Sequence, residues 1–595
     1  MIEQKLTEAI NKAISVLYHA EVQEKQMQLQ KTRAEFQGDY TLVVFPLLSI
    51  SRKKPEETAQ DLGEYLVVNL QEVTGFNVIK GFLNLTISDG YWLSFFSQHH
   101  AKENYGKRQA GNKDPFVLEY SAPNTNKPLH LGHVRNNLLG WSVAEILKAA
   151  GEQVVKVNLV NDRGIHICKS MLAWQKWGGG KTPEKLKVKG DKLVGDYYVQ
   201  FDRAFKEEVA GLTESGMSKD EAAKKAPLIL EAQDMLKKWE GHDPEIRVLW
   251  ERMNGWVYEG FEVTYDRMGV DFDKTYYESD TYLLGRTLVL EGLEKGVLFK
   301  KKDGSIWCDL SDEGLDEKLL LRADGTSVYM TQDLGTAQLR YDDYHPSELI
   351  YVVGNEQNYH FDVLKIVLKK LGRNWADHIR HLSYGMVELP HGKMKSREGT
   401  VVDADDLMDE MVETARRTTE ELGKFDDFAP EESARLYEML GLGALKYFIL
   451  KVDPKKTMLF NPEESLDFNG NTGPFIQYTH ARIKSVLRKA DQQKIEYMDF
   501  ADSPSQLEEK ERNLVKLLYD YPKSIQQAAQ SLSPALIANF AYDLAKEYNQ
   551  FYHELQILRE PDTATRNFRL MLSGFVAATL KSATGLLGIE VPERM

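Results

Sequence analysis

Two histidines, His130 and His133, form an H-x-G-H pattern with Gly132 between them. Imidazoles at positions i and i+3 of a helix lie on one face, where both can donate hydrogen bonds to one phosphate. The free N–H groups and the dipole of a helix N-terminus favour an anion at the same place. Gly132 removes a side chain where a nucleotide would have to approach. The pattern predicts a nucleotide-phosphate site, although two ordinary histidines at a helix start would look alike.

The residues around this pattern predict a strand, a helix and a second strand. Residues 116–120 (FVLEY) and 153–160 (QVVKVNLV) are apolar runs typical of buried strands, and residues 131–150 carry apolar residues at helical spacing. H-x-G-H therefore falls at a strand-to-helix turn of a βαβ unit. Residues 349–354 (LIYVVG) begin a second such unit. We expect a doubly wound parallel sheet that binds ligands at the carboxyl ends of its strands.

A basic cluster follows the strand predicted over residues 379–387. It runs from Gly392 to Gly399 and reads GKMKSREG. Cations on a loop bracketed by glycines could clamp a polyphosphate. A surface turn with accidental basic residues would have the same composition, so the cluster alone leaves both interpretations open.

The segment Glu119-x-Ser121-x-Pro123-Asn124-x-x-Lys127-Pro128-x-His130-x-Gly132-His133 resembles the signature of class I aminoacyl-tRNA synthetases, and closely that of the arginyl family. Other segments resemble that family in the same chain order. They are Gly81-Phe82-Leu83-Asn84 near the N-terminus, residues 322–333, the basic cluster, which is similar to the K-M-S-K-S loop with Ser396 at the second lysine position, and residues 473–482. Gln332 stands where the family usually has Arg.

The resemblance implies roles for individual residues. ATP and the charge that develops on it would be held by Lys127, His130, His133, Lys393, Lys395 and Arg397, with Leu131, Gly132, Met394 and Ser396 in contact. The arginine pocket would consist of Glu119, Ser121, Asn124, Tyr329, Asp333, Gln357 and His360. A guanidinium carries five donors in a fixed fork, so its site needs carboxylates that accept paired N–H groups. Glu119 and Asp333 match those positions, with Asp333 one turn beyond Tyr329 if that segment is helical.

The resemblance covers essentially the whole chain and implies three domains. Residues 1–106 would form a small α+β domain that contacts the tRNA elbow, and residues 107–460 a Rossmann-like α/β catalytic domain with a parallel sheet and an insertion at about 178–269. Residues 461–595 would form an all-helical anticodon-binding bundle that contacts tRNA through Phe475, Tyr478 and Met595. The implied reaction converts arginine and ATP to arginyl-adenylate and pyrophosphate and then transfers the arginyl group to the terminal ribose of tRNA(Arg), and activation needs bound tRNA. Mg²⁺ and a monomeric enzyme are also implied.

Composition sets the outer bounds. The net charge of −15 argues against a nucleic-acid partner at first, but residues 475–595 contain 15 Lys and Arg against 15 Asp and Glu. Cys168 and Cys308 give neither zinc spacing nor a disulfide framework, which indicates a reducing compartment. No apolar run approaches the ~18 residues of a membrane span. We expect a cytoplasmic protein with no protein-bound metal and no membrane partner.

Three alternatives remain open from the sequence. A small-molecule nucleotidyltransferase would also use H-x-G-H, although it would not need the large helical C-terminus. An RNA-binding relative without activity would not need His130, His133 and Lys393. Another class I synthetase, for glutamate or cysteine, is the closest competitor, but the cysteinyl type would want zinc-ligand cysteines.

Overall fold

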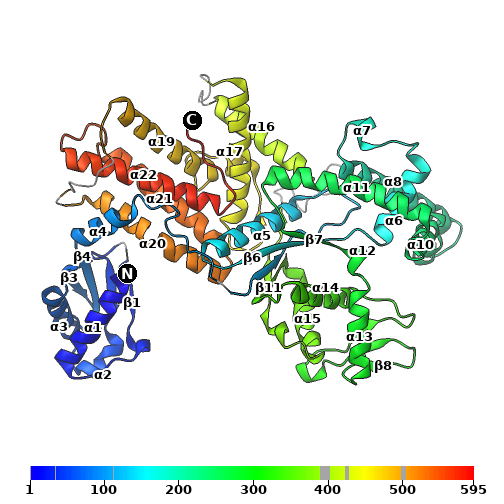
Figure 1. Ribbon diagram of the computed structural model, residues 1–595, viewed down its shortest axis with the longest axis horizontal. Helices are drawn as coiled ribbons and strands as arrows, with labels where there is room; N and C mark the ends of the chain where they lie inside the picture. The colour runs from blue at the N-terminus through cyan, green and yellow to red at the C-terminus, as the bar shows by residue number, and fades with distance from the viewer. Residues whose placement is uncertain are drawn as a thin grey trace. The chain divides into compact units, whose positions relative to one another are not determined.

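The computed structural model describes residues 2–33, 35–111, 113–388, 402–421, 428–497, 504 and 506–595 (Figure 1). The chain divides into two compact units, each assembled from segments distant in sequence. Unit 1 comprises Met1–Tyr105, Ser485–Asp520 and Lys546–Ala578, and unit 2 comprises Gly106–Lys484, Tyr521–Ala545 and Thr579–Met595.

The N-terminal part of unit 1 is an antiparallel sheet with the strand order β1-β2-β4-β3. The helices and strands of this part of the chain are α1 (Ile2–Tyr18), η1 (Glu24–Gln26), β1 (Leu29–Lys31), β2 (Tyr40–Val43), η2 (Phe45–Leu47), α2 (Leu48–Ser51), α3 (Pro55–Asn69), β3 (Val73–Ile79), β4 (Phe82–Ile87) and α4 (Asp89–His99). Helix α3 begins at Pro55, whose fixed φ suits a first helical turn. The apolar run over residues 40–48 (YTLVVFPLL) predicts a strand, but β2 ends at Val43, because Pro46 has no N–H for a sheet and the chain turns into η2.

Four C-terminal helices contribute residues to both units. They are α19 (Gly473–Gln492), α20 (Glu509–Ser531), α21 (Ala535–Glu554) and α22 (Thr563–Gly585). Within unit 1, Arg512 on α20 donates to both carboxylate oxygens of Asp89, at 2.7 and 3.0 Å. The buried Arg569–Glu511 pair, 2.6 Å apart, joins α22 to α20. These contacts join the N-terminal sheet to the helical segments that follow 380 residues later in the chain, so that both belong to one unit.

Unit 2 contains a five-stranded sheet in which all neighbouring strands are parallel. The order is β12 (Ile379–Tyr384), β11 (Glu348–Gly354), β5 (Phe116–Glu119), β6 (Val154–Val160) and β7 (Lys274–Tyr277). The chain builds β5, β6 and β7 in one direction and then places β11 on the other side of β5. The switch point of this doubly wound sheet therefore lies between β5 and β11, where such folds bind ligands. The predicted parallel α/β fold is confirmed.

Helix α5 (Leu131–Ala149) follows β5, and α15 (Asn358–Lys370) follows β11 after η4 (Asn355–Gln357). The apolar core of this region joins the sheet to α13, α14 and α15 and includes Val117, Val157, Leu334, Leu349 and Val363. The remaining elements around it are α12 (Glu278–Thr281), α13 (Leu284–Glu294), β8 (Phe299–Lys300), β9 (Ile306–Cys308), η3 (Ser311–Glu313), β10 (Lys318–Leu321), α14 (Tyr329–Tyr344) and η5 (Asn374–His378).

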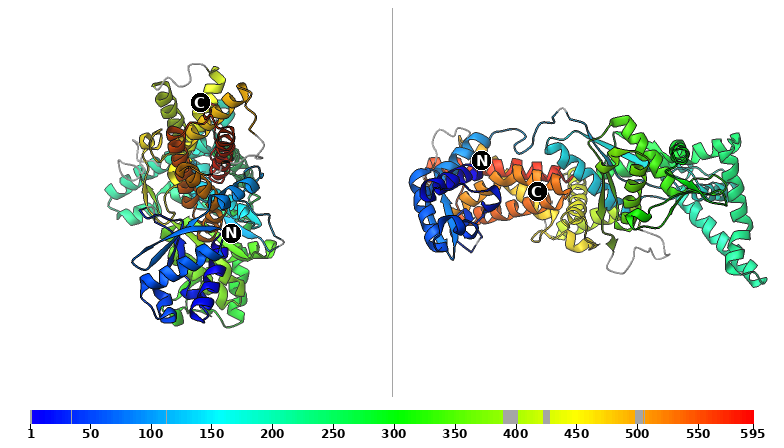
Figure 2. Two further views of the ribbon diagram at one scale, coloured as in Figure 1. Left: turned by 90° about the vertical axis from the view of Figure 1, so that its left-hand side faces the viewer. Right: turned by 90° about the horizontal axis from the view of Figure 1, so that it is seen from below.

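The segment expected to be a helical insertion is helical. It contains α7 (Pro183–Leu186), α8 (Gly190–Glu214), α9 (Lys219–Lys225), α10 (Pro227–Glu240) and α11 (Pro244–Met268), and it follows α6 (Ile165–Trp177). Figure 2 shows these helices, coloured from teal to green, gathered in one group on one side of the unit 2 sheet. A further group contains β13 (Val387–Glu388), α16 (Ala404–Glu421), α17 (Pro430–Leu450), β14 (Met458–Leu459) and α18 (Pro462–Ser465).

The last residues of the chain pack inside unit 2. Ser142 on α5 donates to the carbonyl of Leu586 at 2.7 Å, and the Lys446 ammonium donates to the carbonyl of Gly588 at 2.6 Å. Removing the C-terminus would therefore also remove contacts that support α5 and α17, so single substitutions are better probes of this region than truncation.

Candidate active site

The H-x-G-H residues cap the N-terminus of α5, at the switch point of the sheet. His130 is the N-cap residue, and its Nδ1 accepts a hydrogen bond from the Gly132 N–H at 3.2 Å. The Nδ1 of His133 accepts from the His130 N–H at 3.2 Å, and the two ring centroids lie 3.9 Å apart. A neutral imidazole whose Nδ1 accepts a hydrogen bond carries its proton on Nε2. Both histidines therefore present an Nε2–H donor.

The charge state of these donors follows from their surroundings. Burial, and to a smaller extent the nearby Lys127 ammonium, lower the pKa of His130 to about 4. Burial, His130 and Lys127 together hold the pKa of His133 well below its usual range. Burial also lowers the pKa of Lys127. At neutral pH the helix end thus offers two neutral donors beside one cation, a set suited to phosphate oxygens.

Gly132 has a structural reason as well as the predicted functional one. A Cβ at this position would lie 3.0 Å from Cε1 and 3.1 Å from Nδ1 of His130. The absence of a side chain therefore makes room for the His130 ring itself. Leu131, the other predicted ATP contact in this turn, is fully buried and anchors the turn in the core.

The end of β5 has a strained backbone that asparagines hold in place. Ser121 and Ala122 both have left-handed φ values, +79° and +48°, which cost L residues free energy. Asn136 on α5 accepts from the Ser121 N–H at 2.5 Å, and Asn158 accepts from the Ala122 N–H at 3.0 Å. Asn136 also donates to the Val352 carbonyl on β11 at 2.7 Å, so it bridges both strands of the switch point. The predicted substrate residue Ser121 is thereby fixed in place.

Two carboxylates expected to bind a guanidinium have different partners. Glu119, at the end of β5, is buried and forms an ion pair with the buried Arg340 of α14. Burial raises the pKa of Glu119, while Arg340 opposes that rise. Asp333 lies one turn after Tyr329 on α14, as the sequence suggested, and its Oδ2 lies 2.6 Å from the His360 Nε2 on α15. A guanidinium at Glu119 would have to share that carboxylate with Arg340. The Asp333 carboxylate is accessible by contrast, because its side chain is 38% exposed.

Other predicted pocket residues surround this pair with accessible side chains. Tyr329 is 80% exposed, and Asn124 and Gln357 are also exposed. The Asn124 backbone forms a bridge with Asn161, and Gln357 is the N-cap residue of α15. Asn124 follows β5, Gln357 follows β11, and Tyr329 is the first residue of α14.

The basic cluster, Lys393, Met394, Lys395, Ser396 and Arg397, lies outside the described residues. Both of its flanks are tied to α5. Before it, Arg135 donates to the Met386 carbonyl at 3.3 Å, and after it, the Leu131 N–H donates to the Val402 carbonyl at 3.2 Å. The described residues on both sides of the basic cluster therefore lie next to the H-x-G-H turn.

Sequence reasoning missed several residues that build the site. Arg340 holds Glu119, Asn136 joins β5 to β11, and the Tyr265 hydroxyl lies 2.7 Å from the Ser121 Oγ. Nothing local in the sequence marks Arg340, because its burial and its pairing with Glu119 arise only from the fold. Tyr265 comes from the insertion and has no local signal.

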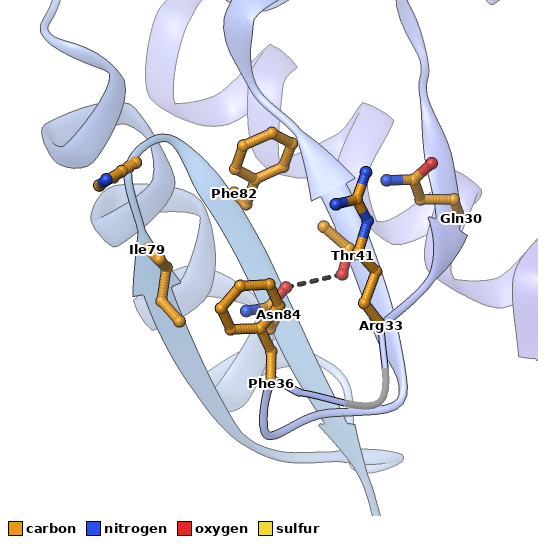
Figure 3. Close-up of a pocket in the computed structure, with 8 residues that line it drawn as sticks. Gln30, Arg33, Phe36, Thr41, Ile79, Phe82 and Asn84 are labelled. Carbon is orange, nitrogen blue, oxygen red and sulfur yellow. Dashed lines mark hydrogen bonds between the residues drawn. The ribbon is translucent and has the colours of Figure 1, made fainter.

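Unit 1 contains a small cavity of about 160 Å³ in its N-terminal sheet (Figure 3). The lining residues are Gln30, Arg33, Phe36, Thr41, Ile79, Lys80, Phe82 and Asn84. The rings of Phe36 and Phe82 are 40% and 37% exposed. Asn84 accepts from the Thr41 hydroxyl at 2.6 Å, while its Nδ2 is buried with no partner among the described residues. The accessible surface of the cavity is thus mainly apolar and aromatic.

The C-terminal residues predicted to contact tRNA lie on or near α19. Phe475 and Tyr478 are half-buried; the Phe475 ring lies 5.4 Å from that of Tyr542, and Arg482 lies over the Tyr478 ring. Gln477 donates to the Glu590 carbonyl at 2.8 Å, which lays the chain end along α19. Met595 follows, partly exposed.

Within the described ranges, no group of three or more His, Cys, Asp or Glu side chains could hold a metal ion. No helix in the described part of the chain is long and apolar enough to cross a membrane.

Comparisons with known proteins agree along the whole chain. Residues 2–87 match the family model of the arginyl tRNA synthetase N-terminal domain, residues 96–461 that of the tRNA synthetases class I (R) catalytic domain, and residues 476–595 that of the DALR anticodon binding domain. The arginine–tRNA ligases of Parabacteroides distasonis and Bacteroides thetaiotaomicron are each 60% identical to the chain, with 100% of both chains covered. The arginyl-tRNA synthetase structure of Thermus thermophilus matches with a TM-score of 0.77 at 24% identity, covering 100% of both chains.

Proposed function

The chain belongs to the arginyl-tRNA synthetases of class I, and from this premise we propose that it is an arginine–tRNA ligase. A carboxylate oxygen of L-arginine attacks the α-phosphorus of ATP, and the bond to pyrophosphate breaks. A hydroxyl of the terminal ribose of tRNA(Arg) then attacks the carbonyl carbon of arginyl-adenylate, and AMP leaves. The protein supplies no nucleophile, so its work is to position the reactants and to stabilise charge on the phosphates.

The observation that carries this proposal is the pair of Nε2–H donors at the N-terminus of α5. His130 and His133 have their Nδ1 atoms occupied by backbone N–H groups, which fixes both rings and leaves Nε2–H as the remaining donor of each. Donors fixed before the reaction cost no reorganisation when charge develops. Lys127 adds a cation beside them, and the basic loop around Lys393, Lys395 and Arg397, with Met394 and Ser396, would add more.

ATP in this reaction would carry Mg²⁺, which bridges and neutralises phosphate oxygens. The described residues offer no cluster of three acidic or imidazole ligands. Mg²⁺ usually keeps several water ligands and binds substrate phosphates rather than a protein cage. The nucleotide would therefore bring the ion with it.

The guanidinium of arginine is a fork of donors, so a site that selects arginine needs matched acceptors. Asp333 has a partly exposed carboxylate whose Oδ2 is held by His360, so its orientation is set before substrate arrives. Tyr329 lies one turn earlier, and Glu119 lies in the wall behind, stabilised by Arg340. Ser121, Asn124 and Gln357 would hold the amino and carboxylate groups of the substrate. A site built for such hydrogen bonds can reject an analogue by about 10⁴ or more, so editing is not needed.

The tRNA would be contacted by both units. In unit 1 the cavity at Phe36 and Phe82 would receive an unpaired base, because aromatic faces stack on bases. Arg33 and Lys80 at its rim would meet phosphates. Phe475, Tyr478 and Met595 would contact the anticodon loop. We also infer that the enzyme works as a monomer in the cytoplasm, as family membership implies.

Arginine-dependent exchange of radioactive pyrophosphate into ATP, with and without tRNA(Arg), tests the proposal. We expect exchange with arginine, dependent on tRNA, and no exchange with glutamate or lysine. Exchange that needs a small-molecule acceptor other than an amino acid would indicate a small-molecule nucleotidyltransferase, and no exchange under any condition would indicate an inactive relative.

A further inference from the structure

A segment far away in the sequence holds His130 in position. The N–H of Leu131 donates to the Val402 carbonyl at 3.2 Å, and the N–H of Ala404 donates to the Leu129 carbonyl at 2.9 Å. These two bonds form an antiparallel bridge between His130 and Asp403. The position of the His130 backbone therefore depends on the position of residues 402–404.

That segment is held in turn by one lysine of the insertion. Lys189, the N-cap residue of α8, forms an ion pair with the Asp405 carboxylate at the start of α16. The Lys189 Nζ also donates to the Thr264 hydroxyl of α11 at 2.5 Å, and Thr264 donates to Asp405 at 3.2 Å. Three elements distant in the chain thus meet at one ammonium group.

Lys189 is the cation at the centre of several carboxylates. Asp191, 1% exposed, lies 3.3 Å from its Nζ, and Asp405 binds it from the other side. Burial and the neighbouring Asp405, Asp406 and Asp191 charges raise the pKa of Asp403 to about 6. Without the ammonium, the Asp191 carboxylate of α8 and the Asp405 carboxylate of α16 would lose the cation between them, and their repulsion would push residues 402–405 away from the insertion.

Helix α8 touches the other flank of the histidine turn as well. Gly195, on α8, lies so close to Pro128 that a Cβ there would be 2.8 Å from the proline Cδ. Gly260 on α11 likewise lies against Asp191, where a Cβ would be 2.4 Å from Oδ1. The insertion therefore contacts the chain on both sides of His130, at residues 127–128 and at residues 402–405.

We propose that Lys189 is a positioning residue for arginine activation: its ion pair with Asp405 links the insertion to the bridge that holds His130 against the ATP phosphates. The helical insertion, to which the sequence assigned no chemistry, then supports the catalytic turn. This inference rests on the proposed function of His130, and it concerns the reaction rate rather than arginine recognition, because the arginine pocket lies at β5, α14 and α15.

The test uses the full-length enzyme in tRNA-dependent pyrophosphate exchange. Lys189→Met keeps the aliphatic stem and removes the charge, and we expect kcat to fall between about 10-fold and 100-fold, the size of effect that small misplacements of reacting groups cause. The KM for arginine should change less than about twofold, because no arginine contact is touched. Lys189→Arg, which keeps the charge, should recover most of the rate. Asp405→Asn should lose rate as Lys189→Met does, and the double variant should be no worse than either single one.

Lys192→Met is the matched control. Lys192 is on the same helix and pairs with Asp406 at 3.6 Å, but both side chains are more than half exposed, so its rate should stay at the wild-type value. Wild-type kcat in Lys189→Met, or an equal loss in Lys189→Arg and Lys189→Met, would overturn the positioning role. So would additive losses in the double variant. Absence of exchange in the wild-type enzyme would instead overturn the proposed function, so the two failures are distinguishable.

Discussion

The Oδ2 of Asp333 lies 2.6 Å from the Nε2 of His360, across the space between α14 and α15. This contact fixes one carboxylate oxygen and leaves the other available as an acceptor. Glu119 differs, because its buried carboxylate is paired with Arg340. Of the two acids that the sequence assigns to the guanidinium, Asp333 is therefore the one that a substrate can reach without displacing an internal cation.

Asp333→Asn should raise the KM for arginine about 10- to 100-fold, because a hydrogen bond to a charged group contributes ~1.5–3 kcal/mol. The KM for ATP should change little. Steady-state pyrophosphate exchange at varied arginine and ATP measures both. Asp342→Asn, on the same helix and bonded only to Gln338 at the surface, is the control. An unchanged arginine KM in Asp333→Asn would refute this pocket.

Substitutions of His133 can distinguish the roles of its two ring nitrogens, because Asn imitates Nδ1 and Gln imitates Nε2. His133→Asn keeps an acceptor near the position of Nδ1 and removes the donor at Nε2, so kcat for exchange should fall about 10²–10³-fold. His133→Gln can place an amide N–H near Nε2 and should retain more activity. The exposed His378, in the same unit, should tolerate alanine. Equal activity of the Asn and Gln variants would contradict donation from Nε2.

The low pKa of His130 gives a pH prediction with a definite sign. The folded value, about 4, lies below the unfolded value of ~6.5. Between these values the unfolded chain binds a proton that the folded chain does not, so the free energy of unfolding falls as pH drops from about 6.5 to 4. Above pH 6.5 this group contributes no pH dependence.

Imidazole NMR of the folded enzyme, with His130 assigned from a His130→Asn variant, should show a midpoint near 4. The same variant should lose less stability than the wild type over this pH range. A His130 midpoint at ~6.5 in the folded protein would contradict the burial argument.

Some of these features can be predicted from the sequence and others cannot. The H-x-G-H turn, the turn from Tyr329 to Asp333 and the parallel order of the strands follow from local spacing, and the structure has them. Arg340, Asn136 and Lys189 could not be foreseen, because their roles depend on contacts with residues far away in the chain. The strand predicted across Pro46 was wrong because apolar composition outweighed the missing N–H. The basic cluster at 393–397 stays a prediction.

The Glu119–Arg340 pair should be a stability element as well as part of the pocket wall. Arg340 is 1% exposed, so Arg340→Met leaves a buried carboxylate without its cation and should cost ~3–5 kcal/mol. Arg380, whose pair with Glu348 at 3.3 Å is 40% and 33% exposed, provides the contrast: Arg380→Met should cost under about 1 kcal/mol. Urea unfolding of the two variants decides between them, and equal costs would show that burial of the first pair does not matter.

The unit 1 cavity offers the sharpest test of tRNA binding outside the active site. Phe36 and Phe82 present half-exposed rings there, and stacking of one base on an aromatic side chain contributes ~1–3 kcal/mol. Phe36→Ala should therefore raise the KM for tRNA(Arg) from about 5-fold to 150-fold, with kcat at saturating tRNA and the KM for arginine unchanged. Val68→Ala removes an 82% exposed side chain elsewhere in the same unit and should change nothing. Arg33→Gln should instead reduce the dependence of tRNA affinity on salt, because a phosphate contact releases counterions. If Phe36→Ala leaves the tRNA KM at the wild-type value, the cavity does not hold a base.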